Sequence, residues 1–263
     1  MPGELLHDEP AEGVLRLTIS NPSKRNALDH AILDGIASAV RAADGDGTRA
    51  VILTGAGGMF SSGYDIGDIP ADVFTVEAER LVAHPFTSAL DALDAFDRPT
   101  VAACGGHTIG GGLELALACD FRVAADGIKL GMPPAKLGLV YSHTGLRRFI
   151  DAVGVPRTRE LFLLGRNIDA ATALGWGLVH QVVAGDDVPG AGVALAAELA
   201  ANAPLSVTGN KRVIRALLDA KWALDPGVEE ELIALRQACF ESEDFREGVA
   251  AFGEKRAARW QGR

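Results

Sequence analysis

One glutamate stands inside an otherwise apolar stretch, directly after a run of glycines. The stretch GGHTIGGGLELALACD covers residues 105–120, and the glutamate is Glu114. Residues 100–103 before it are small or apolar, so the order strand, glycine loop, helix is predicted. The unpaired N–H groups at such a helix start can stabilise an anion or a developing oxyanion. A carboxylate in an apolar first turn is suited to acid or base catalysis, because burial disfavours its charged form. The alternative is that the glycines only allow close packing and Glu114 stabilises the helix start.

A second strand and glycine loop lie earlier in the chain. Residues 50–54 (AVILT) predict a buried strand, and GAGGMFSSGYD follows at 55–65. Each loop can turn a backbone N–H toward one cleft, and two convergent donors form an oxyanion hole. Loss of one such donor typically costs roughly 3 kcal/mol of barrier. The two loops together therefore favour an enzyme that stabilises a negatively charged oxygen.

Composition excludes several other classes of function. The chain has 263 residues, of which 48% are hydrophobic and 23% charged, as in a globular protein of one large or two small domains. Its 25 basic against 35 acidic residues give a net charge of −10, which argues against a nucleic-acid surface. The glycines form neither a G-K-[ST] loop nor a G-x-G-x-x-G turn, so we expect no nucleoside triphosphate or dinucleotide site.

The predicted compartment is the cytoplasm, with no membrane attachment. The first residues, MPGELLHDEP, lack a basic region followed by an apolar run, and no apolar window is long enough to span a bilayer. Cys104, Cys119 and Cys239 have no C-x-x-C spacing, which predicts reduced, buried thiols. The six histidines have no metal-ligand spacing, so no metal site is predicted.

Repeated strand, glycine loop and helix patterns predict an α/β fold with parallel strands. Asp29 is expected to cap a helix that continues to Ala43, and from Asp186 onward the pattern is helical, with prolines at helix starts. Further strands are predicted at 14–20, 50–54, 100–104, 120–124 and 128–130, further helices at 73–96 and 111–119, and helix starts at Pro204 and Pro226.

Seven ordered segments closely resemble the crotonase (enoyl-CoA hydratase/isomerase) superfamily over nearly the whole chain. They are NPSKRNAL at 21–28, VILTGAGGMFSSGYDI at 51–66, RPTVAACGGHTIGGGLELALACDFRVAAD at 98–126, LGLVYSHTGLRRFIDAVG at 137–154, LFLLGRNIDAATALGWGLVHQVV at 161–183, ANAPLSVTGNKRVI at 201–214 and SEDFREGVAAFGEKR at 242–256. The resemblance implies a spiral of ββα repeats over residues 1–200. A C-terminal helical region over 201–263 would then pack between protomers of a homotrimer or a dimer of trimers.

The resemblance also assigns catalytic residues. It implies that the backbone N–H groups of Tyr64 and Gly111 form the oxyanion hole, and that Glu114 is one of the two glutamates of enoyl-CoA hydratases. The second glutamate position is occupied by Pro134. Because hydration is normally handled by that pair of carboxylates, the proline leaves the reaction class open.

Tyr141 stands where hydratases usually have a Pro-Gly pair, and this resembles the methylmalonyl-CoA decarboxylase branch of the superfamily. A phenol can orient a carboxylate or protonate an enolate. As an alternative, Tyr141 packs in the pocket wall, and Ser142 or His143 is the working group.

The substrate implied by the resemblance is an acyl-CoA thioester, with CoA as part of the substrate and no separate cofactor. The residues expected to contact CoA are Lys24, Arg25, Ala27, Ser62, Tyr64, Ile66, Phe252 and Lys255. The alternative is that the lysines and the arginine among them are ordinary solvent-exposed residues with no role in CoA binding.

The sequence thus predicts an acyl-CoA lyase that stabilises a thioester enolate. One hypothesis is a 2-enoyl-CoA hydratase in which Glu114 alone positions water. The second is decarboxylation of malonyl-CoA or methylmalonyl-CoA with help from Tyr141. The third is a non-catalytic CoA-binding homologue, which two intact oxyanion loops argue against.

Overall fold

The strands form two sheets in a computed structural model of the chain, which describes residues 3–65, 80 and 82–263. The larger, six-stranded sheet has the order β1-β2-β3-β5-β7-β10; β1 and β2 pair antiparallel and the other neighbours pair parallel. Its central strands are nearly continuous apolar runs, as parallel strands covered on both faces are. The strands are β1 (Glu4–Ala11), β2 (Val14–Ser20), β3 (Ala50–Gly55), β5 (Thr100–Cys104), β7 (Phe121–Ala125) and β10 (Gln181–Val183).

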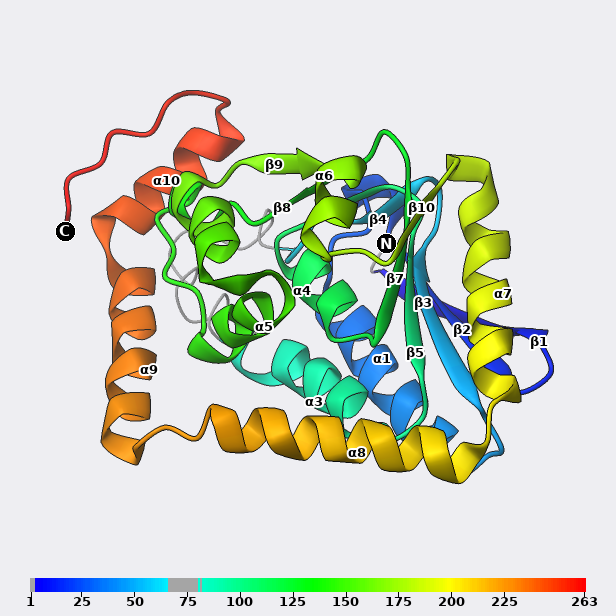
Figure 1. The fold of residues 1–263 in the computed structure, drawn as a ribbon. Coiled ribbons are helices and arrows are strands. Elements are labelled where there is room, and N and C mark those ends of the chain that lie inside the picture. Colours follow the sequence, from blue (N-terminus) through cyan, green and yellow to red (C-terminus); the bar gives the residue numbers. More distant parts are fainter. Residues whose placement is uncertain (1–2, 66–79, 81) are drawn as a thin grey trace.

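The smaller sheet has four short strands in the order β4-β6-β8-β9. They are β4 (Met59–Ser61), β6 (His107–Ile109), β8 (Lys129–Gly131) and β9 (Asn167–Asp169). A central strand of the large sheet precedes each of β4, β6 and β8, and helical structure follows before the chain returns to the large sheet (Figure 1). The predicted α/β spiral of ββα repeats is therefore confirmed.

Helices cover both faces of the large sheet and extend beyond it. α1 contacts β1 and β2, whereas α7 packs against β3, β5 and β7 (Figure 1). The helices are α1 (His30–Ala43), α3 (Thr87–Ala95), α4 (Gly111–Leu117), α5 (His143–Arg159), α6 (Ala170–Trp176), α7 (Val188–Ala201), α8 (Pro204–Lys221), α9 (Pro226–Glu241) and α10 (Glu243–Gly253). Single helical turns lie at Pro22–Lys24, Val82–Phe86, Pro134–Lys136, Glu160–Leu164 and Gly185–Asp187.

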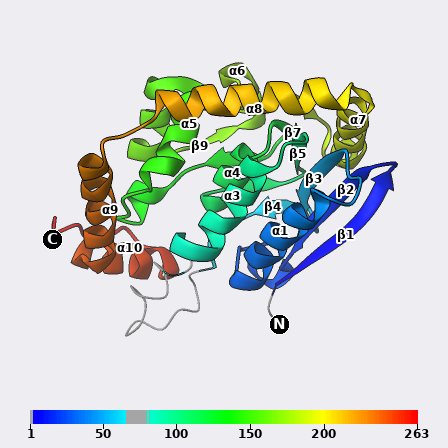
Figure 2. The same ribbon diagram turned by 90° about the horizontal axis from the view of Figure 1, so that it is seen from below.

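The predicted helix starts are present. The Asp29 carboxylate accepts a hydrogen bond from the Ile32 N–H at 2.9 Å, which satisfies one of the unpaired donors of the first turn. α8 and α9 each begin with a proline, whose missing N–H costs nothing at that position. α9 and α10 lie at the opposite end of the molecule from α7 (Figures 1 and 2).

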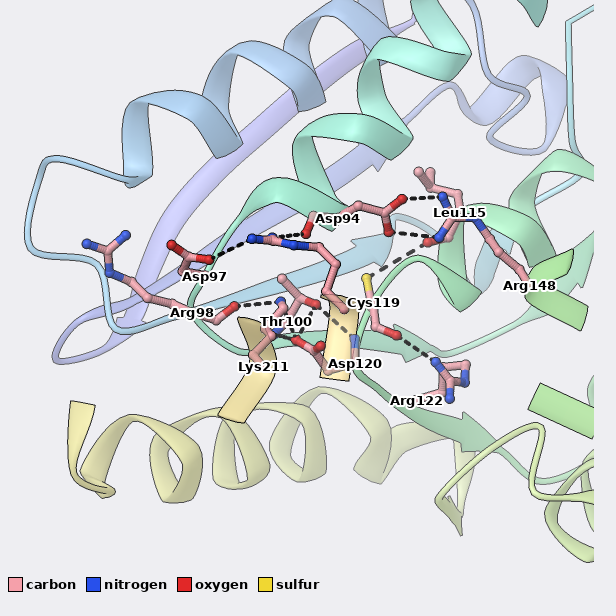
Figure 3. A network of polar contacts seen from close by, with 11 residues as sticks. Asp94, Asp97, Arg98, Thr100, Leu115, Cys119, Asp120, Arg122, Arg148 and Lys211 are labelled. Carbon is pink, nitrogen blue, oxygen red and sulfur yellow. Dashed lines mark hydrogen bonds and ion pairs between the residues drawn. The ribbon is translucent and has the colours of Figure 1, made fainter. Parts of the chain in front are cut away.

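Charged side chains of α8 contact the body of the protein. Lys211 Nζ lies 2.7 Å from Asp120 Oδ2 and donates to the carbonyl of Arg98 (Figure 3). Arg212 Nε donates to Asp97 Oδ2 at 2.7 Å. No residue of α8 is fully buried, although the helix carries several large apolar side chains. The predicted division of the chain into a ββα core (1–200) and a C-terminal helical region (201–263) remains a prediction.

Several elements differ from the sequence prediction. β1 was not predicted, because its sequence ELLHDEPA is largely polar and does not alternate. Of the small sheet, the strand predicted at 128–130 corresponds to β8, whereas β4, β6 and β9 were not predicted, because strands of three residues are too short for a period to be recognised. Of the helix predicted at 73–96, the described part consists of the turn Val82–Phe86, which contains Pro85, and α3. Cys104 and Cys119 are buried as expected, whereas Cys239 is only partly buried.

In the described part of the chain, no single helix is long and apolar enough to cross a bilayer. The segments Gly185–Ala201 and Pro204–Lys221, which are bent by 103° relative to each other, reach the length and hydrophobicity of a span only when taken together.

Candidate active site

The two glycine loops meet where β4 and β6 pair in parallel. A Cβ atom on Gly63 would lie 3.4 Å from the Gly111 nitrogen, and one on Gly111 would lie 2.8 Å from Cε1 of the Tyr64 ring. Gly63 also has a φ of 99°, which side chains rarely adopt. Within the described residues, no turn or loop backbone hydrogen bond uses the N–H of Tyr64 or of Gly111. The chain therefore brings both predicted oxyanion donors to one place.

Asn26 holds the loop that supports Tyr64. It adopts a φ of 55° and is buried, and its side-chain amide donates to the carbonyls of Ala56 and Met59 at 2.8 and 2.7 Å. From this loop, the Leu28 N–H donates to the Gly63 carbonyl at 2.8 Å, and the Asp65 N–H donates to the Leu28 carbonyl at 3.0 Å. These bonds fix the backbone on both sides of Tyr64.

The predicted CoA-binding residues fall into three groups. Lys24 Nζ lies 2.7 Å from Asp65 Oδ2, and the Ser62 hydroxyl donates to the Lys24 carbonyl at 3.1 Å, so the two loops are joined here. Ile66 lies outside the described residues. The structure therefore gathers Lys24, Arg25, Ala27, Ser62 and Tyr64 around the two paired loops.

Phe252 and Lys255 lie apart from this cluster. Phe252, at the end of α10, is 70% exposed, and Lys255 follows the helix with a φ of 54°. No hydrogen bond, ion pair or ring contact joins either residue to Tyr64, Glu114 or Tyr141 in the part of the chain that the structure describes.

Glu114 is the buried carboxyl of the site. It lies in the first turn of α4 and is 1% exposed, and the Tyr141 hydroxyl donates a short hydrogen bond to its Oε2 atom. Burial raises the pKa of Glu114 to about 7, although the Tyr141 hydrogen bond and the Arg148 charge act in the opposite direction. A carboxyl that titrates near neutral pH can both take up and deliver a proton.

Two tyrosines continue the chain of polar contacts from Glu114. The hydroxyls of Tyr64 and Tyr141 lie 3.2 Å apart. Burial, followed by the Glu114 charge, raises the pKa of both phenols well above the ordinary value of 10. Both groups are therefore neutral hydroxyls at physiological pH and can donate to Glu114 or to a bound ligand.

Tyr141 both packs and forms a hydrogen bond. Its ring meets Phe162 edge-on at 5.4 Å between centroids and is 9% exposed, so the packing role and the polar role coexist. The two alternative groups have other contacts: Ser142 accepts the Gly145 N–H at 3.0 Å and caps α5, and His143 Nε2 lies 3.4 Å from Glu229. These contacts favour Tyr141 over Ser142 and His143.

The position of the second hydratase glutamate is a buried proline at the start of a short turn. Pro134 begins the turn Pro134–Lys136, and its carbonyl accepts the N–H groups of Leu137 and Leu139. A proline here has no group that can exchange a proton. The site therefore contains the carboxyl of Glu114 and no carboxyl at position 134.

A comparison with known proteins decides the family. Residues 9–263 match the family model described as enoyl-CoA hydratase/isomerase. The chain belongs to this family. It is 34% identical over 246 residues to a Mycobacterium tuberculosis protein named "Probable enoyl-CoA hydratase", with 92% of this chain and 91% of that protein covered. It is 31% identical over 255 residues to the 2,3-dehydroadipyl-CoA hydratase of Escherichia coli, with 95% and 96% covered.

Solved structures of the family share the fold. Carnitinyl-CoA hydratase from Mycobacterium avium is 33% identical, with a TM-score of 0.83 and 100% of both chains covered. Methylmalonyl-CoA decarboxylase in complex with 2-nitronate-propionyl-CoA is 24% identical, with a TM-score of 0.88 and 99% of both chains covered. At that identity, the likeness to the decarboxylase establishes the fold and leaves the reaction open.

Two residues that lie beside Glu114 were not predicted from the sequence as part of the candidate site, Gly145 and Arg148. A Cβ atom on Gly145 would lie 2.6 Å from the Tyr141 ring and 2.8 Å from Glu114 Oε1. Arg148 Nε lies 3.9 Å from the same oxygen. The Ser142-x-x-Gly145 spacing at the start of α5 was an available signal, because it places Gly145 in the first turn of a helix that follows Tyr141.

We expect Gly145→Ala to damage the site despite the higher helix propensity of alanine. An exposed helical Gly→Ala change stabilises by about 1 kcal/mol, but here the added methyl group must displace the Tyr141 ring or the Glu114 carboxyl. Turnover of acyl-CoA should fall by at least about tenfold, and the melting temperature should not rise. Gly175→Ala is the control, because nothing lies within 4 Å of its added Cβ. Equal behaviour of the two variants would contradict this packing argument.

Proposed function

We propose that this protein is an acyl-CoA lyase that works through a thioester enolate. The observation that carries the proposal is the buried Glu114, hydrogen-bonded by Tyr141 and lying in the helix whose N-terminal Gly111 meets the Tyr64 loop. The thioester carbonyl oxygen would accept hydrogen bonds from the Tyr64 and Gly111 N–H groups. Negative charge that develops on this oxygen would then be stabilised by donors already in place.

The first candidate reaction is hydration of a 2-enoyl-CoA to a 3-hydroxyacyl-CoA. Glu114 would take a proton from water as the water oxygen bonds to Cβ, and the electron pair of the double bond would move into the enolate. Glu114 would then return this proton to Cα, which completes the addition of water and regenerates the carboxylate. The names of the relatives at 31–34% identity support this candidate.

Hydration is expected to be slow. A positioned acid or base typically contributes about 10²–10⁴ in rate, and position 134 lacks one. The rate of hydration of crotonyl-CoA should therefore fall below that of a two-glutamate hydratase assayed in parallel by about this factor. Hydration at the rate of the two-glutamate enzyme would show that the second carboxyl is not needed here.

The second candidate reaction is decarboxylation of malonyl-CoA or methylmalonyl-CoA. Breaking the bond between the carboxylate and Cα releases CO₂ and leaves the electron pair in the enolate, which needs only one proton at Cα. The observation in its favour is that the site has one carboxyl and a neutral tyrosine hydroxyl donating to it. A non-catalytic CoA-binding role has less support, because a binding protein needs no buried carboxyl beside the two loops.

Parallel incubation with crotonyl-CoA and methylmalonyl-CoA, followed by mass spectrometry of the CoA products, tests the two reactions. Gain of one water by crotonyl-CoA supports hydration, and loss of CO₂ from methylmalonyl-CoA supports decarboxylation. A third incubation of butyryl-CoA in D₂O reports enolate formation by deuterium uptake at Cα. No change in any of the three thioesters would overturn the proposed enolate chemistry.

We also propose a cytoplasmic homotrimer or dimer of trimers. The support is that α8 contains no fully buried residue and that Phe252 is 70% exposed, so both present apolar surface to a partner. The exposed large apolar side chains of α8 are Leu205, Val213, Ile214, Leu217 and Leu218.

Light scattering should give a mass that is a multiple of three protomers. Leu217 is 67% exposed. Leu217→Glu should shift the protein toward monomers, because the carboxylate of the new side chain would be buried in the interface without a partner. Arg159→Glu, a charge change on α5, is the control. A fully active monomer would contradict the proposed assembly.

A further inference from the structure

The two carboxyl oxygens of Glu114 have different surroundings. Oε2 accepts the hydroxyl of Tyr141, whereas Oε1 lies 3.9 Å from Arg148 Nε on α5. Within the described residues, neither Glu114 Oε1 nor Arg148 Nε has a hydrogen-bond partner, and both atoms are buried. A buried carboxylate oxygen and a buried guanidinium nitrogen thus face each other at a distance where charge interaction is strong.

Arg148 is fixed from the other side by Asp94 of α3. Its Nη1 donates to Asp94 Oδ1 at 2.8 Å, and its Nη2 donates a short hydrogen bond to Oδ2 (Figure 3). This two-bond fork uses both terminal nitrogens and leaves Nε toward Glu114. The Arg148 side chain is 17% exposed, so the guanidinium cannot turn away into solvent without breaking the fork.

Other charged groups also affect the ionisation of Glu114 and Arg148. The Asp94 charge opposes ionisation of Glu114, but its effect is smaller than that of Arg148. The charge of Asp91, also on α3, contributes to raising the pKa of Arg148. Among the described residues, the other titratable groups that affect Glu114, Tyr141 or Arg148 are Tyr64 after β4 and Asp91 and Asp94 of α3. Arg236 of α9 affects Tyr64.

We propose that Arg148 is a positioning residue that sets the protonation state of Glu114. Held by Asp94, the guanidinium stabilises the carboxylate form that burial disfavours, and so keeps Glu114 able to exchange its proton at neutral pH. This inference rests on the proposed role of Glu114 as the proton carrier. Arg148 touches no substrate in this role and acts through Glu114.

Variants of Arg148 test the proposal through the titration of Glu114. Infrared difference spectra against pH report the carboxyl C=O band of Glu114, which is assigned by its loss in Glu114→Gln. In Arg148→Gln, the midpoint of this titration should rise by about one to three pH units, the usual effect of an opposite charge within 4–6 Å. Arg148→Lys, which keeps the charge, should restore a midpoint nearer that of the native protein.

The matched control is Arg147→Gln. Arg147 is the next residue on α5, but its Nη2 faces Asp219 at 3.5 Å, so its removal should leave the Glu114 midpoint unchanged. If Arg148→Gln leaves Asp94 unpaired and unfolds the protein, the double variant Asp94→Asn/Arg148→Gln removes both charges. Its midpoint should still rise, because the effect of Arg148 on Glu114 exceeds that of Asp94.

A midpoint in folded Arg148→Gln, or in the double variant, that equals the native one would overturn the proposal and leave Arg148 a purely structural residue. The infrared titration needs no turnover, so it tests Arg148 even if no thioester is converted. Where turnover is present, the Glu114 limb of the pH–rate profile should move in the same direction as the infrared midpoint.

Discussion

Glu114→Gln is expected to lower acyl-CoA turnover by about 10²–10⁴-fold, because an amide cannot exchange a proton at the reacting carbon. The variant keeps the size of the side chain, and its carbonyl can still accept the Tyr141 hydroxyl. Binding of a CoA thioester should therefore change little, since the predicted binding groups lie on the loops around Lys24 and Tyr64. Steady-state kinetics and calorimetry with the same thioester separate the two effects. Turnover within a few-fold of native would remove Glu114 from the chemistry.

The same variant should be more stable than the native protein at alkaline pH. The pKa of Glu114 is raised from an ordinary 4.5 to about 7 in the folded state, so the fold favours the protonated form. Below 4.5 the carboxyl is protonated in both states and has no effect. Between pH 4.5 and about 7 the carboxyl ionises in the unfolded state but stays largely protonated in the folded state, so the native protein loses stability over this range. Above pH 7 the loss is complete, on the order of 3 kcal/mol.

Urea unfolding at pH 5 and pH 8 measures this difference. Glu114→Gln and native protein should differ little at pH 5, and the variant should be the more stable at pH 8. The same difference at both pH values would contradict a raised pKa. Asp65→Asn, on the neighbouring loop, controls for the loss of one negative charge near the site.

Tyr141→Phe is expected to lower turnover by about 10–100-fold while leaving CoA affinity nearly unchanged. The ring still packs against Phe162, but Glu114 Oε2 loses its donor, and a buried acceptor left without a partner costs about 1–3 kcal/mol. Because that hydrogen bond stabilises the carboxylate, its loss should also raise the pKa of Glu114 further.

Two assays of Tyr141→Phe test this prediction: CO₂ release from methylmalonyl-CoA and hydration of crotonyl-CoA. A larger loss of CO₂ release than of hydration favours the decarboxylase candidate. Tyr64→Phe is the matched control: it removes the other hydroxyl of the pair, 3.2 Å away, but leaves the bond to Glu114 and the backbone N–H of residue 64 in place. If Tyr141→Phe turns over every substrate at the native rate, the tyrosine only packs.

Local features of the fold could be predicted because short stretches encode them. Residues 50–54 formed a strand from their β-branched run, Asp29 capped α1, and Pro204 and Pro226 began their helices. The short strands β4 and β6 could not be predicted, since three residues carry no period and their pairing depends on how the glycine loops stack.

The sequence by itself determined the order of strand, glycine loop and helix around Glu114 and the strand and glycine loop before Tyr64, because each of these patterns is local. That the two loops meet was decided by the tertiary structure. Only the tertiary structure decided which groups surround Glu114. Tyr141 lies 27 residues from Glu114 along the chain. Asp94 and Arg148 are 54 residues apart, and in the sequence each is indistinguishable from an ordinary charged residue on the surface of a helix. Contacts between such distant residues follow from how the repeats pack against one another, and no local pattern contains that information.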